Sequence, residues 1–240
     1  MGGFKDTNWA DGEFALKYLE NADLIIPERS GFMETLASFG RHFLGGRPGA
    51  ALLDLGCGDG AFTGELLKLD GSMEATLVDA SGEMIQRARE RLGGFKNVKF
   101  IEASFEDLME EKVAVARFDL ASSALALHHL PRAQRGEMNA YVHSLLTEGG
   151  WFINMDVCLS PSETLEEWYL KLWEERIVEE QREAGVKVDY ESFMRKHGER
   201  KHHMRLDTLT DQLGALEKAG FKMVDCFRKY GIFAIYGGRK

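Results

Sequence analysis

The sequence predicts an α/β fold built on a doubly wound, mostly parallel sheet, and two observations carry that prediction. The apolar run 50–53 precedes the glycine-rich stretch 56–60, and a helical pattern covers 61–68, so strand, tight turn and helix follow one another. Further on, the apolar runs 221–227 and 232–238 are joined by a link too short for a parallel crossover. We therefore expect seven strands, parallel except for an antiparallel hairpin formed by the last two.

Residues 1–45 are expected to form helices. Asp11 is a good N-cap for a first helix, and Pro27 opens a second one with an apolar stripe that ends at Phe43. The stretch 45–49 then breaks the pattern before the first strand. These helices either cover a ligand or pack against the sheet, and the sequence favours neither.

Between the first strand and the closing hairpin, strand and helix patterns alternate, as a doubly wound sheet requires. Ser81 is a good N-cap and Pro131 a good first-turn residue, so a helix is expected after each. Further strands are predicted at 75–78, 98–101, 117–123 and 149–156, a further segment at 190–197, and the last helix at 208–220.

The segment 160–205 departs from this alternation and is expected to be a helical insertion. Its first helix carries Trp168, Tyr169 and Trp173 on one apolar face, and Gly185 is expected to end it. Such a face is typical of core or dimer contacts.

Composition limits the classes of partner. The formal net charge of −9 argues against a nucleic-acid or anionic-membrane surface. No apolar run reaches the length of a membrane span, and three cysteines without a signal peptide indicate reduced thiols in a cytoplasmic protein. The basic, histidine-rich stretch 195–203 matches no zinc spacing, so we expect no metal. We expect a monomer or a homodimer.

Two acidic residues beside the glycine turn narrow the choice of ligand. Asp54 stands two residues before Gly56, at the mouth of the predicted crevice, where its carboxylate can receive an ammonium group. Asp79 ends the next strand at the spacing that places a carboxylate on ribose hydroxyls. An amine receptor, a glycine platform and a ribose acid together describe S-adenosylmethionine, whereas a dinucleotide pyrophosphate would be repelled by Asp54.

The stretches 52–60 and 77–84 resemble the first two motifs of class I S-adenosylmethionine-dependent methyltransferases, and the resemblance extends over 50–156. It implies a Rossmann-like fold and S-adenosylmethionine as cofactor. Relatives commonly carry an acid at the position of Ser104, and a hydroxyl accepts a hydrogen bond from adenine more weakly. The implied cofactor-binding residues are Asp54, Gly56, Cys57, Gly58, Asp79, Ala80, Met84, Ser104, Phe105, Ser123 and Ala124.

The resemblance also suggests a division of the chain. It implies one domain over 1–240, in which 1–45 covers the cofactor and 160–205 forms a substrate lid. The motif around Arg29 loosely resembles N-terminal positions that touch the cofactor in carboxy-S-adenosylmethionine synthases, although a surface arginine at a helix start explains it as well.

Methyl transfer to an acceptor is an in-line displacement at a sulfonium, so positioning supplies most of the rate. A base is needed only if the nucleophile must lose a proton. His128 and His129 follow the fourth predicted strand, beside the expected methyl group, and are the first candidates. Asp156 ends the fifth strand and either lines the pocket or caps a helix. Structural roles are the alternative for both histidines.

We therefore predict an S-adenosylmethionine-dependent methyltransferase that acts on a small-molecule acceptor. The alternatives are a carboxy-S-adenosylmethionine synthase-like transferase, a non-catalytic S-adenosylmethionine-binding protein, and a nicotinamide-dependent oxidoreductase. Asp54 and the terminal hairpin oppose the last of these. The sequence does not distinguish O, N, S or C as the acceptor atom.

Overall fold

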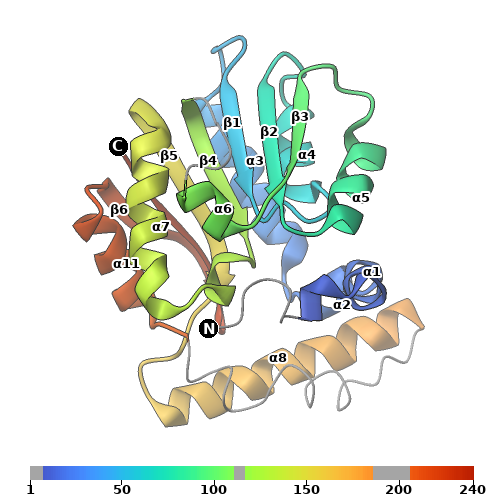
Figure 1. Cartoon of the computed structure of the whole chain (residues 1–240). Coiled ribbons are helices and arrows are strands. Elements are labelled where there is room, and N and C mark those ends of the chain that lie inside the picture. Colours follow the sequence, from blue (N-terminus) through green and yellow to red (C-terminus); the bar gives the residue numbers. More distant parts are fainter. Residues whose placement is uncertain (1–7, 111–116, 186–205) are drawn as a thin grey trace.

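The computed structural model describes residues 8–110, 117–185 and 206–240, and it confirms the predicted sheet. Seven strands lie in the order β3-β2-β1-β4-β5-β7-β6, and β7 is antiparallel to both of its neighbours (Figure 1). The strands are β1 (Ala51–Leu55), β2 (Glu74–Asp79), β3 (Val98–Glu102), β4 (Phe118–Ala124), β5 (Leu146–Val157), β6 (Lys222–Tyr230) and β7 (Phe233–Arg239).

Helices cover both faces of the sheet. They are α1 (Gly12–Glu20), α2 (Ala22–Ile25), α3 (Arg29–Phe43), α4 (Ala61–Leu67), α5 (Gly82–Leu92), α6 (Phe105–Met109), α7 (Arg132–Leu145), α8 (Glu163–Ala184) and α11 (Leu209–Lys218). Helices α3, α4 and α5 pack on the face that carries Leu52 and Ile153, and α6, α7 and α11 on the face that carries Leu53 and Phe152. The middle of the sheet is therefore buried on both sides, as parallel sheets are.

The strand order contains a switch point between β1 and β4. From β1 the chain proceeds outward to β2 and β3, and from β4 it proceeds in the other direction to β5. Open α/β sheets bind their ligands outside the carboxyl ends of the strands at such a point. In this region Asp54 pairs in register with Ser122, and Leu55 pairs with Ser123.

The N-terminal helices lie across the carboxyl ends of these strands, as Figure 1 shows. Asp11 caps α1 as predicted, because its side chain accepts from the backbone N–H groups of Glu13 and Phe14. Helix α3 begins two residues later than Pro27, after Glu28 in the left-handed region at φ 55°. Helix α2 was not predicted, since a single turn shows no periodicity.

Helix α8 crosses the same end of the molecule, beside α2 (Figure 1). Gly185 ends it with φ 67°, as predicted. The indole Nε1 of Trp173 donates to the carbonyl oxygen of Ile25 at 2.7 Å, and its ring meets Phe233 edge to face. Trp168 is 55% exposed. Trp173 thus joins α8 to the N-terminal helices and to the sheet, whereas Trp168, expected on the same apolar face, points to solvent.

Two elements differ from the expectation. Strand β5 begins at Leu146, directly after α7, and so is longer than predicted. Helix α6 was missed, although Ser104 and Asp107 form a capping box that marks its start. The predicted segment 190–197 and the basic stretch 195–203 lie outside the described residues. Within the described ranges, no helix combines the length and apolarity that crossing a bilayer requires.

Candidate functional site

The turn between β1 and α4 requires glycine. Gly56 has φ 65°, and a Cβ at this position would lie 2.4 Å from the Cβ of Ala126. Gly58 has φ 54°, with open space where its Cβ would be. The N–H groups of Gly56 and Cys57 both donate to the carbonyl oxygen of Val78, which ties the turn to β2. Bare backbone therefore faces the crevice, as the sequence predicted.

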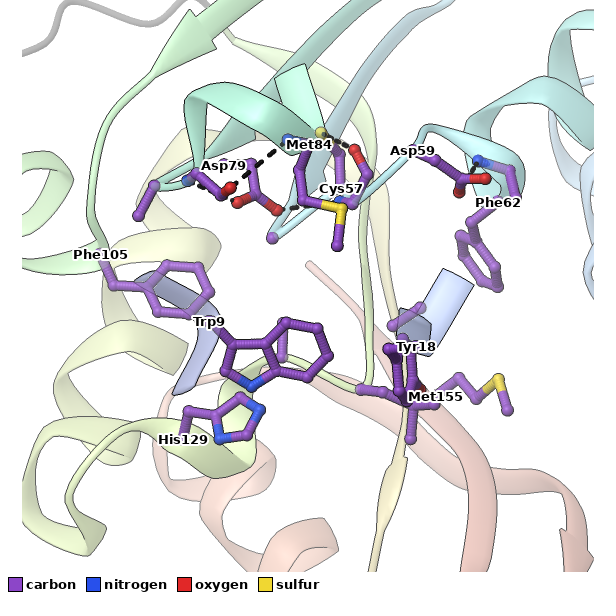
Figure 2. Close-up of a pocket in the computed structure, with 18 of the residues that line it drawn as sticks. Trp9, Tyr18, Cys57, Asp59, Phe62, Asp79, Met84, Phe105, His129 and Met155 are labelled. Carbon is purple, nitrogen blue, oxygen red and sulfur yellow. Dashed lines mark hydrogen bonds between the residues drawn. The ribbon is translucent and has the colours of Figure 1, made fainter. Parts of the chain in front are cut away.

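A cavity of about 760 Å³ lies in front of this turn. We call one side the strand-end wall; it comprises Gly56, Cys57, Gly58, Asp79, Ala80, Met84, Ser104, Phe105 and Ala124. The other side, the N-terminal wall, comprises Trp9, Tyr18, Leu19, Ala22, Ile26, Arg29 and Met33. Figure 2 shows His129 and Met155 beside Trp9 and Tyr18, across the cavity from Asp79 and Met84. The volume lies in the upper part of the roughly 300–1,000 Å³ range of small-molecule sites.

Asp79 lies at the end of β2 and lines the cavity, as expected. Its Oδ2 accepts from the N–H of Gly58 and its Oδ1 from the N–H of Ser81, both at 2.9 Å. Burial raises the pKa of Asp79, and these backbone hydrogen bonds oppose the shift. A carboxylate has about four lone-pair sites, so Asp79 can still accept from hydroxyl groups of a ligand.

Asp54 does not lie where the sequence analysis placed it. Its side chain is 1% exposed, behind the strand-end wall, and does not line the cavity. It accepts from Thr63 Oγ1 at 2.5 Å and from Ser122 Oγ at 3.1 Å. Burial raises the pKa of Asp54 to about 6, against the effect of these hydrogen bonds. Ser123 is likewise turned away, because its Oγ donates to the carbonyl oxygen of Leu55 at 2.8 Å.

The remaining residues predicted for the cofactor are brought to the cavity, but Ser104 is occupied. Its Oγ accepts from the N–H of Asp107 at 3.1 Å and donates to the Asp107 carboxylate at 2.7 Å, so the hydroxyl belongs to the cap of α6. Phe105 and Met84 offer apolar surface beside it. Cys57 lines the cavity with a buried thiol, and burial raises its pKa.

The two histidines have different surroundings. The Nδ1 of His128 lies 2.5 Å from Asp156 Oδ1, and the N–H of His128 donates to Asp156 Oδ2 at 3.1 Å. His128 and Asp156 both line a second cavity of about 30 Å³, formed with Asn154 and Tyr236. His129 lines the main cavity. Of the two predicted bases, His129 therefore lies at the site, whereas His128 is engaged by Asp156.

The N-terminal wall contains residues that the sequence analysis did not select. Trp9 meets Tyr18 edge to face, with ring centroids 4.9 Å apart, and meets His129 at 5.6 Å. Burial raises the pKa of Tyr18, and the nearby positive charge of Arg29 offsets only part of this rise. Arg29 Nη1 lies 2.5 Å from Asp23 Oδ1. An aromatic residue near a helix is indistinguishable from core in the sequence, so no signal marked Trp9 or Tyr18.

A model of the methyltransferase domain family matches residues 47–208, from the start of the sheet through the long insertion helix. The chain belongs to this family. Membership confirms the predicted S-adenosylmethionine-dependent methyltransferase at the level of the family. It also agrees with the strand order, the antiparallel hairpin and the glycine turn described above.

The curated relatives match this chain over different lengths. The chain is 24% identical to the carboxy-S-adenosyl-L-methionine synthase of Idiomarina loihiensis, over 88% of this chain and 85% of that protein. It is 31% identical to malonyl-[acyl-carrier protein] O-methyltransferase 1 of Ilyobacter polytropus, over 41% of this chain. The match spans 35% of that relative, and 26% of the corresponding protein of Halalkalibacterium halodurans.

Solved structures share the fold. An O-methyltransferase family protein from Burkholderia thailandensis superposes with a TM-score of 0.67 at 14% identity, over 98% of this chain and 62% of that one. A second structure is the 1,6-didemethyltoxoflavin-N1-methyltransferase of the same species, with bound 1,6-didemethyltoxoflavin and S-adenosylhomocysteine. It superposes with a TM-score of 0.62 at 20% identity, over 100% of this chain and 91% of that one.

Proposed function

We propose that this methyltransferase transfers the methyl group of S-adenosylmethionine to a small-molecule acceptor by in-line displacement. One observation carries the proposal. A single cavity joins the glycine turn and Asp79 to a separate, largely apolar wall made by the N-terminal helices. The volume of about 760 Å³ suits a cofactor and an acceptor together. A solved relative of the same fold binds S-adenosylhomocysteine and an acceptor at once.

The strand-end wall fits S-adenosylmethionine. Asp79 retains acceptor capacity for the two ribose hydroxyls, and Gly58 leaves room for close approach by the cofactor. Phe105 and Met84 suit the adenine ring. We assign Asp54 and Ser123 supporting roles, because both lie behind this wall and hold the end of β1 in register with β4.

S-adenosylmethionine supplies an electrophilic methyl group on a sulfonium. The N-terminal wall orients the acceptor in line with that methyl group and keeps water out, which accounts for most of the expected acceleration. Where the acceptor must lose a proton, His129 is the base, since its ring lines the cavity and histidine is the side chain that most often acts as a general base.

A carboxy-S-adenosylmethionine synthase-like activity is the second candidate, because that relative matches 88% of the chain. The added carboxylate of such a ligand needs a cation within hydrogen-bond reach. Arg29 lines the cavity with one guanidinium nitrogen bonded to Asp23, but it belongs to the N-terminal wall and not to the strand-end wall that we assign to the cofactor. We therefore expect S-adenosylmethionine or S-adenosylhomocysteine to be released when freshly purified protein is heated. A released species heavier by one carboxyl unit, seen by mass spectrometry, would favour the second candidate.

Ligand-dependent melting tests the proposal against the nicotinamide alternative. A ligand that binds the native state raises the melting temperature by mass action. S-adenosylmethionine and S-adenosylhomocysteine are expected to raise it, and NADH is not. A shift with NADH and none with S-adenosylhomocysteine would refute the methyltransferase assignment. The lid role of 160–205, the oligomeric state and a cytoplasmic location stay predictions.

A further inference from the structure

The N-terminal wall presents a rigid aromatic surface. Trp9 is held edge to face by Phe14 at 5.3 Å, by Tyr18 at 4.9 Å and by His129 at 5.6 Å, so two rings of α1 and one ring from beyond β4 fix its orientation. Figure 2 shows Trp9, Tyr18 and His129 together on one side of the cavity. Rings that are already ordered lose little entropy on binding and prefer flat aromatic partners. Leu19, Ile26, Met33 and Met155 complete an apolar surround.

One end of this wall is suited to an oxygen atom. The Tyr18 hydroxyl makes no hydrogen bond within residues 8–110, 117–185 and 206–240, and burial raises its pKa, so it keeps its proton and can donate. The charge of Arg29 lies close enough to act on Tyr18. A guanidinium has five N–H donors, and the described bond to Asp23 uses one nitrogen of the group. Tyr18 and Arg29 together thus offer donors to an oxygen.

The same geometry disfavours a cationic acceptor. Groups of aromatic rings often bind ammonium ions. Here, however, the Arg29 guanidinium lines the same wall and would repel a second positive charge. An oxygen that carries negative charge gains from both Arg29 and Tyr18, through charge-assisted hydrogen bonds in a largely apolar cavity.

We propose that the acceptor is a planar aromatic molecule that carries an anionic oxygen, with its ring against Trp9 and its oxygen at Tyr18 and Arg29. This inference rests on the proposed function, because it assigns the N-terminal wall to the acceptor only if the cofactor occupies the strand-end wall. It adds the chemical class of the acceptor, which neither the family nor the glycine turn specifies.

Binding measured by calorimetry in the presence of saturating S-adenosylhomocysteine tests it with three probes. We choose 2-naphthoate, which is planar and anionic, 2-naphthol, which is planar and neutral, and decanoate, which is anionic and flexible. The variants are Trp9→Leu, His129→Ala and Arg29→Met. Their matched controls are Trp168→Leu and Arg87→Met, which change exposed side chains of α8 and α5 outside the cavity.

Each substitution is expected to change the affinities of the three probes differently. In the unchanged protein, 2-naphthoate binds most tightly. Trp9→Leu and His129→Ala weaken both naphthalenes by roughly tenfold, and Arg29→Met weakens 2-naphthoate by roughly tenfold but 2-naphthol by less than about threefold, as the loss of one charged hydrogen bond requires. The controls leave all three affinities unchanged. Retained melting temperatures show that the variants fold.

Two results would overturn the inference. One is tighter binding of decanoate than of 2-naphthoate, or no binding of either naphthalene. The other is an equal loss of both naphthalenes in Arg29→Met. Failure of the proposed function is recognised separately, because S-adenosylhomocysteine itself would then fail to bind the unchanged protein.

Discussion

The two walls of the cavity are built in different ways. The strand-end wall comes from turns that directly follow β1, β2 and β3, and its main hydrogen bonds join residues about twenty positions apart, such as Gly58 and Asp79. The N-terminal wall comes from 9–33, and its neighbours His129 and Met155 lie about a hundred positions or more further along the chain. The first wall is a local motif, whereas the second exists only once the whole fold has formed.

This difference separates two kinds of specificity. A local turn fixes the geometry for a ligand that the whole family shares, so its residues can be identified from short stretches of sequence. A wall assembled from distant elements can change one side chain at a time without disturbing the turn. We therefore expect substitutions near the N-terminal wall to alter stability or acceptor binding, and substitutions in the strand-end wall to alter cofactor binding.

Asp156→Ala is expected to have the largest effect. The side chain is 1% exposed and accepts from the backbone N–H of His128, from Val157 N–H, and pairs with the His128 ring. The substitution leaves the two backbone N–H groups and the His128 ring without this acceptor, and each buried polar group left unpaired costs about 1–3 kcal/mol. Urea unfolding should show this loss, while calorimetry shows unchanged affinity for S-adenosylhomocysteine. Glu217→Ala, at an exposed position of α11, is the control. A loss below about 1 kcal/mol would contradict the role of Asp156 in holding the turn after β4.

Asp79→Asn tests the strand-end wall. The asparagine side chain keeps an oxygen that can accept from one backbone N–H, but it lacks the carboxylate charge that we expect to bind the ribose hydroxyls. Hydrogen bonds to a charged group contribute about 1.5–3 kcal/mol each. We expect calorimetry to show that the affinity for S-adenosylhomocysteine falls by about 30-fold. Glu74→Gln, at the opposite and exposed end of β2, should have no effect. Equal affinity in Asp79→Asn and the unchanged protein would place the ribose elsewhere.

The pH dependence of stability tests the buried position of Asp54. Its folded pKa of about 6 is above the ordinary 3.8, so folding favours the protonated form. The stability that it contributes is therefore complete below pH 3.8, is lost as the pH rises through about 6, and levels off above that; the size is roughly 2–3 kcal/mol. Asp54→Asn should flatten this part of the unfolding profile. A profile that is unchanged in Asp54→Asn would mean that Asp54 is solvated.

Trp173→Phe is expected to have the smallest effect. It removes the hydrogen bond from Nε1 to the Ile25 carbonyl oxygen but keeps a ring against Phe233, so the cost is about 1 kcal/mol. Because Ile25 immediately precedes Ile26 of the N-terminal wall, acceptor KM should change more than the affinity for S-adenosylhomocysteine. Trp168→Phe, at an exposed position of the same helix, is the control. Larger losses in the control than in Trp173→Phe would assign the acceptor contact to the outer face of α8.

The sequence predicted local features well and long-range ones poorly. The turn at Gly56, the cap at Asp11 and the hairpin of β6 and β7 depend on neighbouring residues, and all were found. The buried position of the Asp54 side chain was missed, because it depends on hydrogen bonds from Thr63 and from Ser122, which lies on a strand far along the chain. Trp9 was missed for the same reason, since contacts with Tyr18 and His129 distinguish it from any apolar residue.

The position of β7 has a consequence for how the molecule folds. It follows β6 in sequence but lies between β5 and β6, so β5 has an open hydrogen-bonding edge until the hairpin docks. Strand β5 ends at Val157 and β7 begins at Phe233, so closing this edge requires contacts between distant parts of the chain, which form late. A long apolar edge is prone to pair with another chain during that interval. Refolding yield should therefore fall as the protein concentration rises, and a yield independent of concentration would contradict late docking of β7.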